Sequence, residues 1–253
     1  MVLLHAGVVD RRAWGGVIEA LARDDLDLIA YDRRGYGETP AGDEAFTHLA
    51  DLVAVLDDAG LERATVVGNS MGGALALDLA ATAPERVTGL VLLAPGVTGM
   101  TDEGEEVQWE AGAEAEAILG ALDQAQQAGD VDAAVRLQLH LWLDGPTQPE
   151  GRVVGPAREL AAEMSRRILE ATGGQDEGDA EPDTWHHLGS VDVPAIVAWG
   201  DLDIPGDFFW YEQIGRRLAR ATTRVLHGCA HLPSLEQPEV VAALVREAVG
   251  GRG

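Results

Sequence analysis

Short apolar runs alternate with segments of helical periodicity along most of the chain. The runs predict strands at 2–4, 26–31, 64–68, 86–95, 193–199 and 222–226, and the periodic segments predict helices at 14–23, 45–59, 71–83, 208–219 and 237–249. The strand runs are continuous rather than alternating, which is typical of strands buried on both faces. Strands separated by helices predict an α/β fold, with a mostly parallel sheet and helices on both faces.

The pattern changes over residues 96–190, where helical periodicity continues but the strand-like runs stop. This stretch is acidic and contains three tryptophans, Trp109, Trp142 and Trp185. We interpret it as a helical cap or lid inserted into the sheet domain. The predicted α/β core then comprises residues 1–95 and 191–253.

Acidic residues far outnumber basic ones. The 253 residues include 43 Asp and Glu against 18 basic residues, all of them arginine, so the formal net charge is −25. Such a chain should repel the phosphates of nucleic acid and of anionic membranes, so we predict neither as a partner. The acidic surface fits either ordinary solubility or adaptation to high salt, where screening weakens repulsion between like charges.

Signals for disulfides, membrane insertion and export are not found in the sequence. Cys229 is the single cysteine, which excludes an intramolecular disulfide and a multi-cysteine metal site. No apolar run approaches the ~18 residues that a membrane span needs. The N-terminal residues lack the basic start and the cleavage site of a signal peptide. We therefore predict a cytoplasmic protein, and its oligomeric state is not indicated.

The strongest chemical signal is Gly-Asn-Ser-Met-Gly at 68–72, between a predicted buried strand and a predicted helix. G-x-S-x-G in this setting is the pattern of a nucleophile elbow, a sharp turn that exposes a serine hydroxyl. Side chains at Gly68 and Gly72 would clash as the chain folds back. The N-terminus of the following helix directs N–H groups at the site. Ser70 is therefore the candidate nucleophile.

A serine hydroxyl needs a base to accept its proton, and the base needs a carboxylate to orient it. Of the seven histidines, we favour His231, in the loop after the last strand, over His227, which ends that strand. Asp203 and Asp201 both follow the strand at 193–199, and we favour Asp203 with Asp201 as the alternative. Loops at the carboxyl ends of parallel strands lie on one side of the sheet, which is where Ser70 lies as well.

The tetrahedral intermediate of acyl transfer needs two N–H donors for its oxyanion. We predict the backbone N–H of Met71, which follows the nucleophile, and that of Gly7, in the loop after the first strand. The candidate substrate-binding residues are the tryptophans of the insertion, which are expected to line an acyl pocket: Trp109, Trp142 and Trp185.

Motifs over nearly the whole chain resemble those of the α/β-hydrolase fold superfamily. They are LLHAG at 3–7, YDRRGYGETP at 31–40, VGNSMGGALALDLA at 67–80, PERVTGLVLLAP at 84–95, AWGDLDIP at 198–205 and GCAHLPSLEQP at 228–238. The resemblance implies the chain order Ser, Asp, His, with the acid at Asp203 and the base at His231. It also implies that Asp32 and Arg33 belong to a structural loop, and that the enzyme needs no metal or organic cofactor.

The chain departs from this family at its start. Members usually begin with an antiparallel strand pair before the strand that carries the His-Gly loop, whereas Met1 here already lies in that strand. We therefore expect this pair to be absent and the strand at 26–31 to form an edge of the sheet.

The resemblance implies a serine hydrolase that cleaves a small carboxylic ester or lactone through an acyl-enzyme. Similar haloalkane dehalogenases and epoxide hydrolases carry aspartate at the elbow, so Ser70 implies acyl transfer instead. Two alternatives stay open. One is a carbon–carbon bond hydrolase of the meta-cleavage type, whose elbow VGNSMGGA resembles. The other is a non-catalytic small-molecule receptor with the same fold.

Overall fold

Six strands form one sheet in the computed structural model, which describes residues 1–42, 44–101, 108–171 and 182–250. They are β1 (Val2–Leu4), β2 (Ile29–Ala30), β3 (Ala64–Asn69), β4 (Val87–Leu93), β5 (Ala195–Gly200) and β6 (Ala221–Leu226), in the order β2-β1-β3-β4-β5-β6. All five pairings between these neighbours are parallel. The order reverses between β1 and β3, and ligands bind at the carboxyl ends of strands at such a switch point.

The predicted parallel α/β sheet is confirmed, and its N-terminal edge is β2. This strand is shorter than the predicted 26–31 because it pairs only with Val2 and Leu3 of the three-residue β1.

Alternate residues of each central strand face two different layers of helices. One layer contains α2 (His48–Asp58), α3 (Met71–Thr82) and α8 (Asp207–Arg217), and the other contains α1 (Gly15–Ala20) and α10 (Pro238–Gly250). In β4, Leu90 and Leu92 pack in the first layer, whereas Val91 and Leu93 pack in the second. Burial on both faces explains why the strands have continuous apolar sequences.

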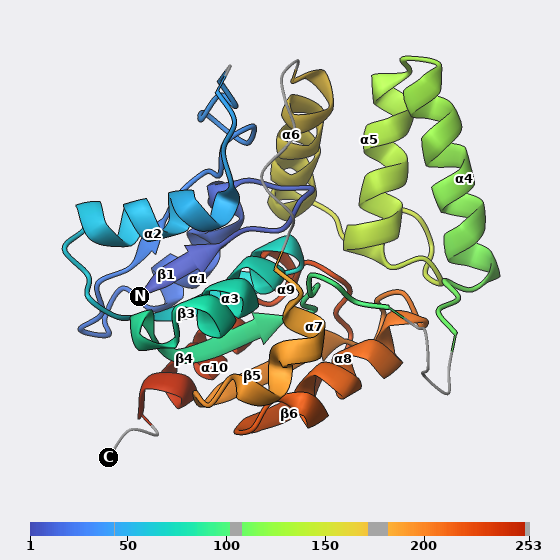
Figure 1. Ribbon diagram of the computed structural model, residues 1–253. Helices are drawn as coiled ribbons and strands as arrows, with labels where there is room; N and C mark the ends of the chain where they lie inside the picture. The colour runs from blue at the N-terminus through green and yellow to red at the C-terminus, as the bar shows by residue number, and fades with distance from the viewer. Residues whose placement is uncertain (43, 102–107, 172–181, 251–253) are drawn as a thin grey trace.

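Four helices between β4 and β5 stand apart from these layers, and we call them the cap helices (Figure 1). They are α4 (Ala113–Gln127), α5 (Val131–Leu139), the π-helical turn η3 (His140–Asp144) and α6 (Pro156–Glu170). Leu139, Leu143 and Met164 of the cap helices pack against Val9 and Leu232, which follow β1 and β6. The cap helices therefore lie over the carboxyl end of the sheet.

The last part of the predicted insertion packs in the core of the sheet rather than with the cap helices. It forms α7 (Thr184–His187) and the short helix η4 (Leu188–Ser190). Trp185 and Leu188 are buried in the layer of α3 and α8, and Figure 1 shows α7 beside these two helices. Burial of these two apolar side chains places residues 184–190 with the core in spite of their position in the sequence.

Further short helices are η1 (Arg11–Trp14), η2 (Pro84–Arg86) and α9 (Pro233–Glu236). Over the ranges that the structure describes, no helix combines the length and the apolar character needed to cross a membrane.

Candidate active site

The predicted nucleophile lies at the turn from β3 into α3. Ser70 has φ 55° and ψ −117°, a backbone conformation that residues with side chains rarely adopt. A Cβ added at Gly68 would lie 2.2 Å from the carbonyl oxygen of Gly72, and one added at Gly72 would lie 2.2 Å from that of Leu4. The two glycines therefore permit a close approach of backbone segments, as the elbow pattern predicts.

We expect Gly72→Ala to destabilise the fold, because its methyl group meets the backbone of β1. Overpacking of this kind costs about 1–3 kcal/mol or more. Thermal unfolding followed by circular dichroism measures the effect. Gly120→Ala in α4 is the matched control, since a Cβ at Gly120 meets no atom within 4 Å and alanine favours helix. Equal melting temperatures for Gly72→Ala and the wild type would contradict the close approach.

Asp203 and His231 form a buried, hydrogen-bonded pair. The N–H at Nδ1 of His231 donates to Oδ2 of Asp203 at 2.8 Å, and both side chains are almost fully buried. The other carboxylate oxygen, Oδ1, accepts the backbone N–H of Ile204 at 2.8 Å. The hydroxyl of Tyr211 donates to Oδ2 at 3.0 Å. Asp203 is thus held in place by groups other than the imidazole, and it can orient that ring.

The alternative acid and the alternative base pair with each other at the surface. Nδ1 of His227 lies 2.9 Å from Oδ2 of Asp201, and the His227 side chain is 86% exposed. Oδ1 of Asp201 accepts the backbone N–H of Gly228 at 2.7 Å, so this carboxylate caps a turn. The structure therefore brings Asp203 to His231 and separates both from Asp201 and His227.

The elbow and the loop that carries His231 are joined directly. The side-chain amide of Asn69, the residue before Ser70, donates to the carbonyl oxygen of His231 at 3.1 Å and to that of Leu93 at 2.9 Å. The backbone N–H of Ser70 donates to the same Leu93 carbonyl at 2.9 Å. The ends of β3 and β4 therefore meet the loop after β6 beside the predicted nucleophile, although the three segments are distant in sequence.

Burial and charge act in opposite directions on the base. Burial lowers the pKa of His231, but the charge of Asp203 and the hydrogen bond that His231 donates to it, with the charges of Asp207 and Glu236, outweigh burial and raise the pKa above its ordinary value of 6.5. A pKa raised in this way makes the imidazole a stronger proton acceptor. The site can therefore take a proton from a hydroxyl held beside the ring.

Known proteins resemble the chain over nearly its whole length. Residues 1–244 match the Alpha/beta hydrolase family. The chain belongs to the alpha/beta hydrolase family. The family resemblance drawn from the sequence motifs is thereby confirmed, and this hydrolase has the fold that those motifs imply.

Individual relatives of the hydrolase carry different names. A 2-hydroxy-6-oxononadienedioate/2-hydroxy-6-oxononatrienedioate hydrolase of Paraburkholderia phymatum is 27% identical over 94% of this chain and 83% of its own length. A pimeloyl-[acyl-carrier protein] methyl ester esterase of Aromatoleum aromaticum is 28% identical over 99% and 98%, respectively. Among solved structures, an esterase from Rhodococcus sp. ECU1013 has a TM-score of 0.72 and 26% identity, covering 100% of this chain and 90% of that one.

The Met71 side chain lies over Gly7, the other residue predicted to supply an oxyanion donor. A Cβ added at Gly7 would lie 2.4 Å from Sδ of Met71. In the first turn of α3, the N–H groups of Gly73 and Ala74 donate to the carbonyl of Ser70 at 2.8 and 3.0 Å. The N–H of Met71 has no backbone acceptor within the described part of the chain. This amide at a helix N-terminus is suited to an anion, and its role stays a prediction.

The three tryptophans predicted to bind substrate occupy different places in the hydrolase. The Trp142 ring lies against the His231 ring, with centroids 4.5 Å apart. Trp109 is partly exposed, and its Nε1–H donates at 2.7 Å to Asp207, four residues after the candidate acid Asp203. Trp185 is buried against Trp210 in the core. The structure therefore brings Trp142 to His231, whereas Trp185 packs in the core.

Several groups at this site have no signal in the sequence motifs. Tyr211 of α8 reaches the acid, with its hydroxyl 3.0 Å from Asp203, and the Asp207 carboxylate lies 3.5 Å from the same hydroxyl. Burial raises the pKa of Asp207, and the hydrogen bond from Trp109 offsets part of that effect. The predicted helix at 208–219 includes Tyr211, but its periodicity does not indicate which group the hydroxyl meets.

The structural role implied for Asp32 and Arg33 agrees with their contacts. Asp32 accepts the backbone N–H groups of Arg11 at 2.8 Å and Glu38 at 2.9 Å. The Arg33 guanidinium donates to the carbonyl of His5 at 3.1 Å. Both residues therefore brace loops beside β1 rather than the pair of Asp203 and His231.

Proposed function

We propose that this hydrolase cleaves small carboxylic esters or lactones through an acyl-enzyme on Ser70. His231 serves as the base and then as the acid, and Asp203 orients His231. The backbone N–H groups of Met71 and Gly7 hold the oxyanion. These three side chains supply the nucleophile, the proton transfer and the orientation, so the proposed reaction needs no metal or organic cofactor.

One observation carries the proposal: the buried pair of Asp203 and His231 is anchored to the elbow residue next to Ser70. The 2.8 Å hydrogen bond from His231 to Asp203 sets the tautomer, leaving Nε2 of the ring free of a proton when the ring is neutral. The bond from Asn69 to the carbonyl of His231 fixes the loop against the elbow. This arrangement supports proton transfer from a serine hydroxyl to an oriented imidazole.

The proposed reaction has two halves. The Ser70 oxygen attacks the carbonyl carbon of the ester while its proton passes to His231, and the negative oxygen is held by the two backbone N–H groups. The intermediate then expels the alcohol, which takes the proton back from His231. Water, activated by the same imidazole, releases the acid and restores the free serine.

A hollow next to the base supports an apolar substrate group. Its cavity volume is about 10 Å³, room for about one water molecule, and the space around it is open to solvent. Its lining comes from the loop after β1, from the cap helices and from the residue after His231: Val8, Val9, Gln138, Leu139, Trp142, Ala161, Ser165 and Leu232. Most of these residues are apolar, which suits the alkyl part of an acyl or alcohol group.

The same lining supports ester cleavage over the carbon–carbon alternative. The relative from Paraburkholderia phymatum is named for a dioate, which carries two carboxylates. Buried carboxylates require cationic or hydrogen-bonding partners. None of the residues that line the hollow is basic, and the net charge of −25 repels a dianion.

Hydrolysis of p-nitrophenyl esters of graded acyl length tests the proposal and the place of the pocket. We expect turnover of acetate and butyrate esters. Ala161→Leu should lower kcat/KM for the butyrate relative to the acetate by about 10-fold, because the larger side chain extends into the hollow.

The next residue on α6 provides the matched control. Ala162→Leu adds the same atoms at a half-buried position outside the lining of the hollow, and its butyrate-to-acetate ratio should equal that of the wild type. If both variants kept the butyrate-to-acetate ratio of the wild type, the acyl group would bind outside the hollow. Absence of turnover of every ester, with no labelling by a fluorophosphonate probe, would favour the receptor alternative instead.

A further inference from the structure

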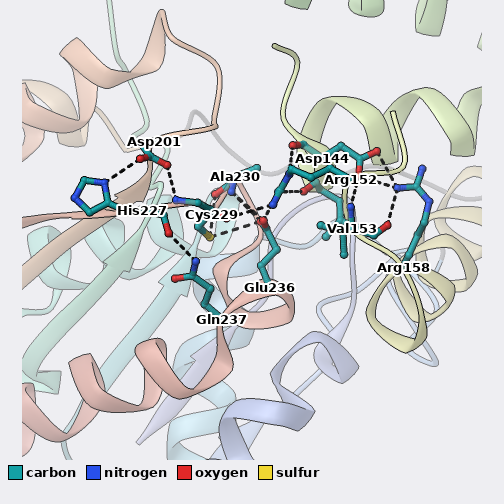
Figure 2. A network of polar contacts seen from close by, with 12 residues as sticks. Asp144, Arg152, Val153, Arg158, Asp201, His227, Cys229, Ala230, Glu236 and Gln237 are labelled. Atoms are coloured by element: carbon teal, nitrogen blue, oxygen red, sulfur yellow. Dashed lines mark hydrogen bonds and ion pairs between the residues drawn. The ribbon is translucent and has the colours of Figure 1, made fainter. Parts of the chain in front are cut away.

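A buried carboxylate fastens the loop that carries His231 (Figure 2). Glu236 in α9 has a side chain that is 3% exposed. Both of its carboxylate oxygens accept the backbone N–H of Ala230, each at 3.0 Å. The Cys229 thiol lies 3.6 Å from Oε1 of the same group. Glu236 thus holds the two residues that precede the proposed base, although it does not touch the reacting atoms.

Arg152 connects this carboxylate to the cap helices. Its Nη2 forms an ion pair with Oε2 of Glu236 and donates to the carbonyl of Leu143 at 2.7 Å. Its Nε donates to the carbonyl of Asp144 at 2.6 Å, and its Nη1 donates to that of Gly228 at 3.2 Å. One guanidinium therefore joins the end of η3 to the loop after β6, as Figure 2 shows.

The segment that presents Arg152 is itself held firmly. The Asp144 side chain is fully buried and accepts the backbone N–H groups of Gly151 at 2.7 Å and Val153 at 2.9 Å. Arg158 of α6 pairs with the same carboxylate at 2.8 Å. These bonds fix the turn on either side of Arg152, so the guanidinium has a defined position relative to η3.

The same part of the cap touches the proposed base directly. The backbone N–H of His231 donates to the carbonyl of Trp142 at 3.1 Å, and the two rings pack together. The π-helical turn η3 supplies both contacts, and π-helical turns often occur at functional sites. The backbone of His231 is therefore fixed from the cap by Trp142 and, through Ala230 and Glu236, by Arg152.

We propose that Arg152 is a positioning residue, which acts through Glu236 to make the placement of His231 depend on the cap segment 140–158. This inference rests on the proposed function of His231 as the base. Here the cap holds the backbone of the base in place, in addition to covering the substrate. Loss of the guanidinium leaves a carboxylate buried without its cation, which is unfavourable enough to shift the loop.

Steady-state kinetics with p-nitrophenyl butyrate tests the inference. Arg152→Gln is expected to lower kcat by about 10- to 100-fold with KM within about threefold, because a displacement of ~1 Å at a catalytic group can cost ~10²-fold in rate. Arg152→Lys should recover only part of the loss, since lysine cannot form the forked contacts. Arg152→Gln combined with Glu236→Gln should lose no more than the larger single loss, as expected for residues that act as one unit.

A second ion pair between core and cap gives the matched control. Arg12 of η1 pairs with the exposed Glu163 of α6 at 2.6 Å. Neither residue belongs to the loop after β6. Glu163→Gln removes this link and should leave kcat within about twofold of the wild type, as for other surface pairs. Wild-type kcat in Arg152→Gln, or a change in KM alone, would overturn the positioning role.

A titration of the His231 imidazole by NMR gives an answer without any substrate. Burial lowers the pKa of His231, whereas the charges of Asp203, Asp207 and Glu236 raise it. Glu236→Gln removes one of these charges, so the His231 pKa should fall, and an unchanged pKa would overturn the inference. If the wild type hydrolyses no ester, the proposed function fails, but this titration still decides whether Glu236 acts on His231.

Discussion

Ser70→Ala should abolish ester hydrolysis, with kcat lower than that of the wild type by ~10⁴-fold or more. The hydroxyl is the only group at the elbow that the proposed reaction uses to form the acyl-enzyme, and alanine occupies the same volume without it. The residual rate reflects the oxyanion donors and substrate binding alone. Initial rates with p-nitrophenyl butyrate measure the loss.

The variant must be compared with a protein that folds equally well. Ser70→Ala keeps a Cβ at the same strained backbone position, so its melting temperature should match that of the wild type. Ser190→Ala in the short helix η4 is the matched control, because the exposed Ser190 hydroxyl donates to the carbonyl of His187. Ester turnover above ~10% of wild type in a folded Ser70→Ala protein would contradict the serine mechanism.

Asp203→Asn should lower kcat at neutral pH by ~10⁴-fold. An asparagine at this position donates a hydrogen bond where the carboxylate accepts one, so His231 is held in the wrong tautomer. The charge of Asp203 also raises the pKa of His231 against the effect of burial. Without that charge the His231 pKa should fall, and the acid limb of the residual kcat/KM profile should move to lower pH.

The wild-type profile sets the reference for this shift. The base must be neutral to accept a proton, so kcat/KM should decline as the pH drops through the His231 pKa, with the midpoint above 6.5. Asp201→Asn is the matched control, since it removes the charge that pairs with His227 at the surface and keeps a side-chain oxygen that can accept the Gly228 N–H. Its rate and its acid limb should match the wild type within about twofold. A larger loss in Asp201→Asn than in Asp203→Asn would reverse the assignment of the acid.

Local sequence predicts the elbow because its constraint is local. The strand, the two glycines and the following helix lie within 64–82, and the clash that requires Gly68 involves residues four and five positions away, Gly72 and Gly73. The parallel sheet is predictable for a similar reason, since continuous apolar runs indicate strands with both faces covered. The sequence cannot show which strand becomes a short edge, because that depends on how few residues β1 offers for pairing.

The choice between the two aspartates needs the structure. Asp201 and Asp203 lie two residues apart beyond the same strand, and the chain turns between them. The N–H of Leu202 bonds to the carbonyl of Cys229 at 2.9 Å, which directs one carboxylate outward and the other toward His231. Such a turn is set by a contact with a segment 27 residues away, and periodicity carries no information about it.

The places of the tryptophans and the contact between Arg152 and Glu236 also could not be predicted from the sequence, because they depend on residues that are far apart along the chain. Periodicity indicates which face of a helix is apolar, but not whether that face meets the substrate hollow, as Trp142 does, or the core, as Trp185 does. Arg152 and Glu236 are 84 residues apart, and neither stands in a motif that predicts the other. The π-helical turn η3 also departs from the 3.6-residue period that helix prediction assumes.

The position of a fluorophosphonate adduct shows whether Ser70 is the nucleophile that His231 activates. We expect one adduct per chain, on the peptide that contains Ser70, with labelling much slower in Asp203→Asn and unchanged in Asp201→Asn. Mass spectrometry of the intact protein and of its peptides gives both the number of adducts and their position. An adduct on a different residue, or no adduct on a protein that hydrolyses esters, would contradict Ser70 as the nucleophile activated by His231.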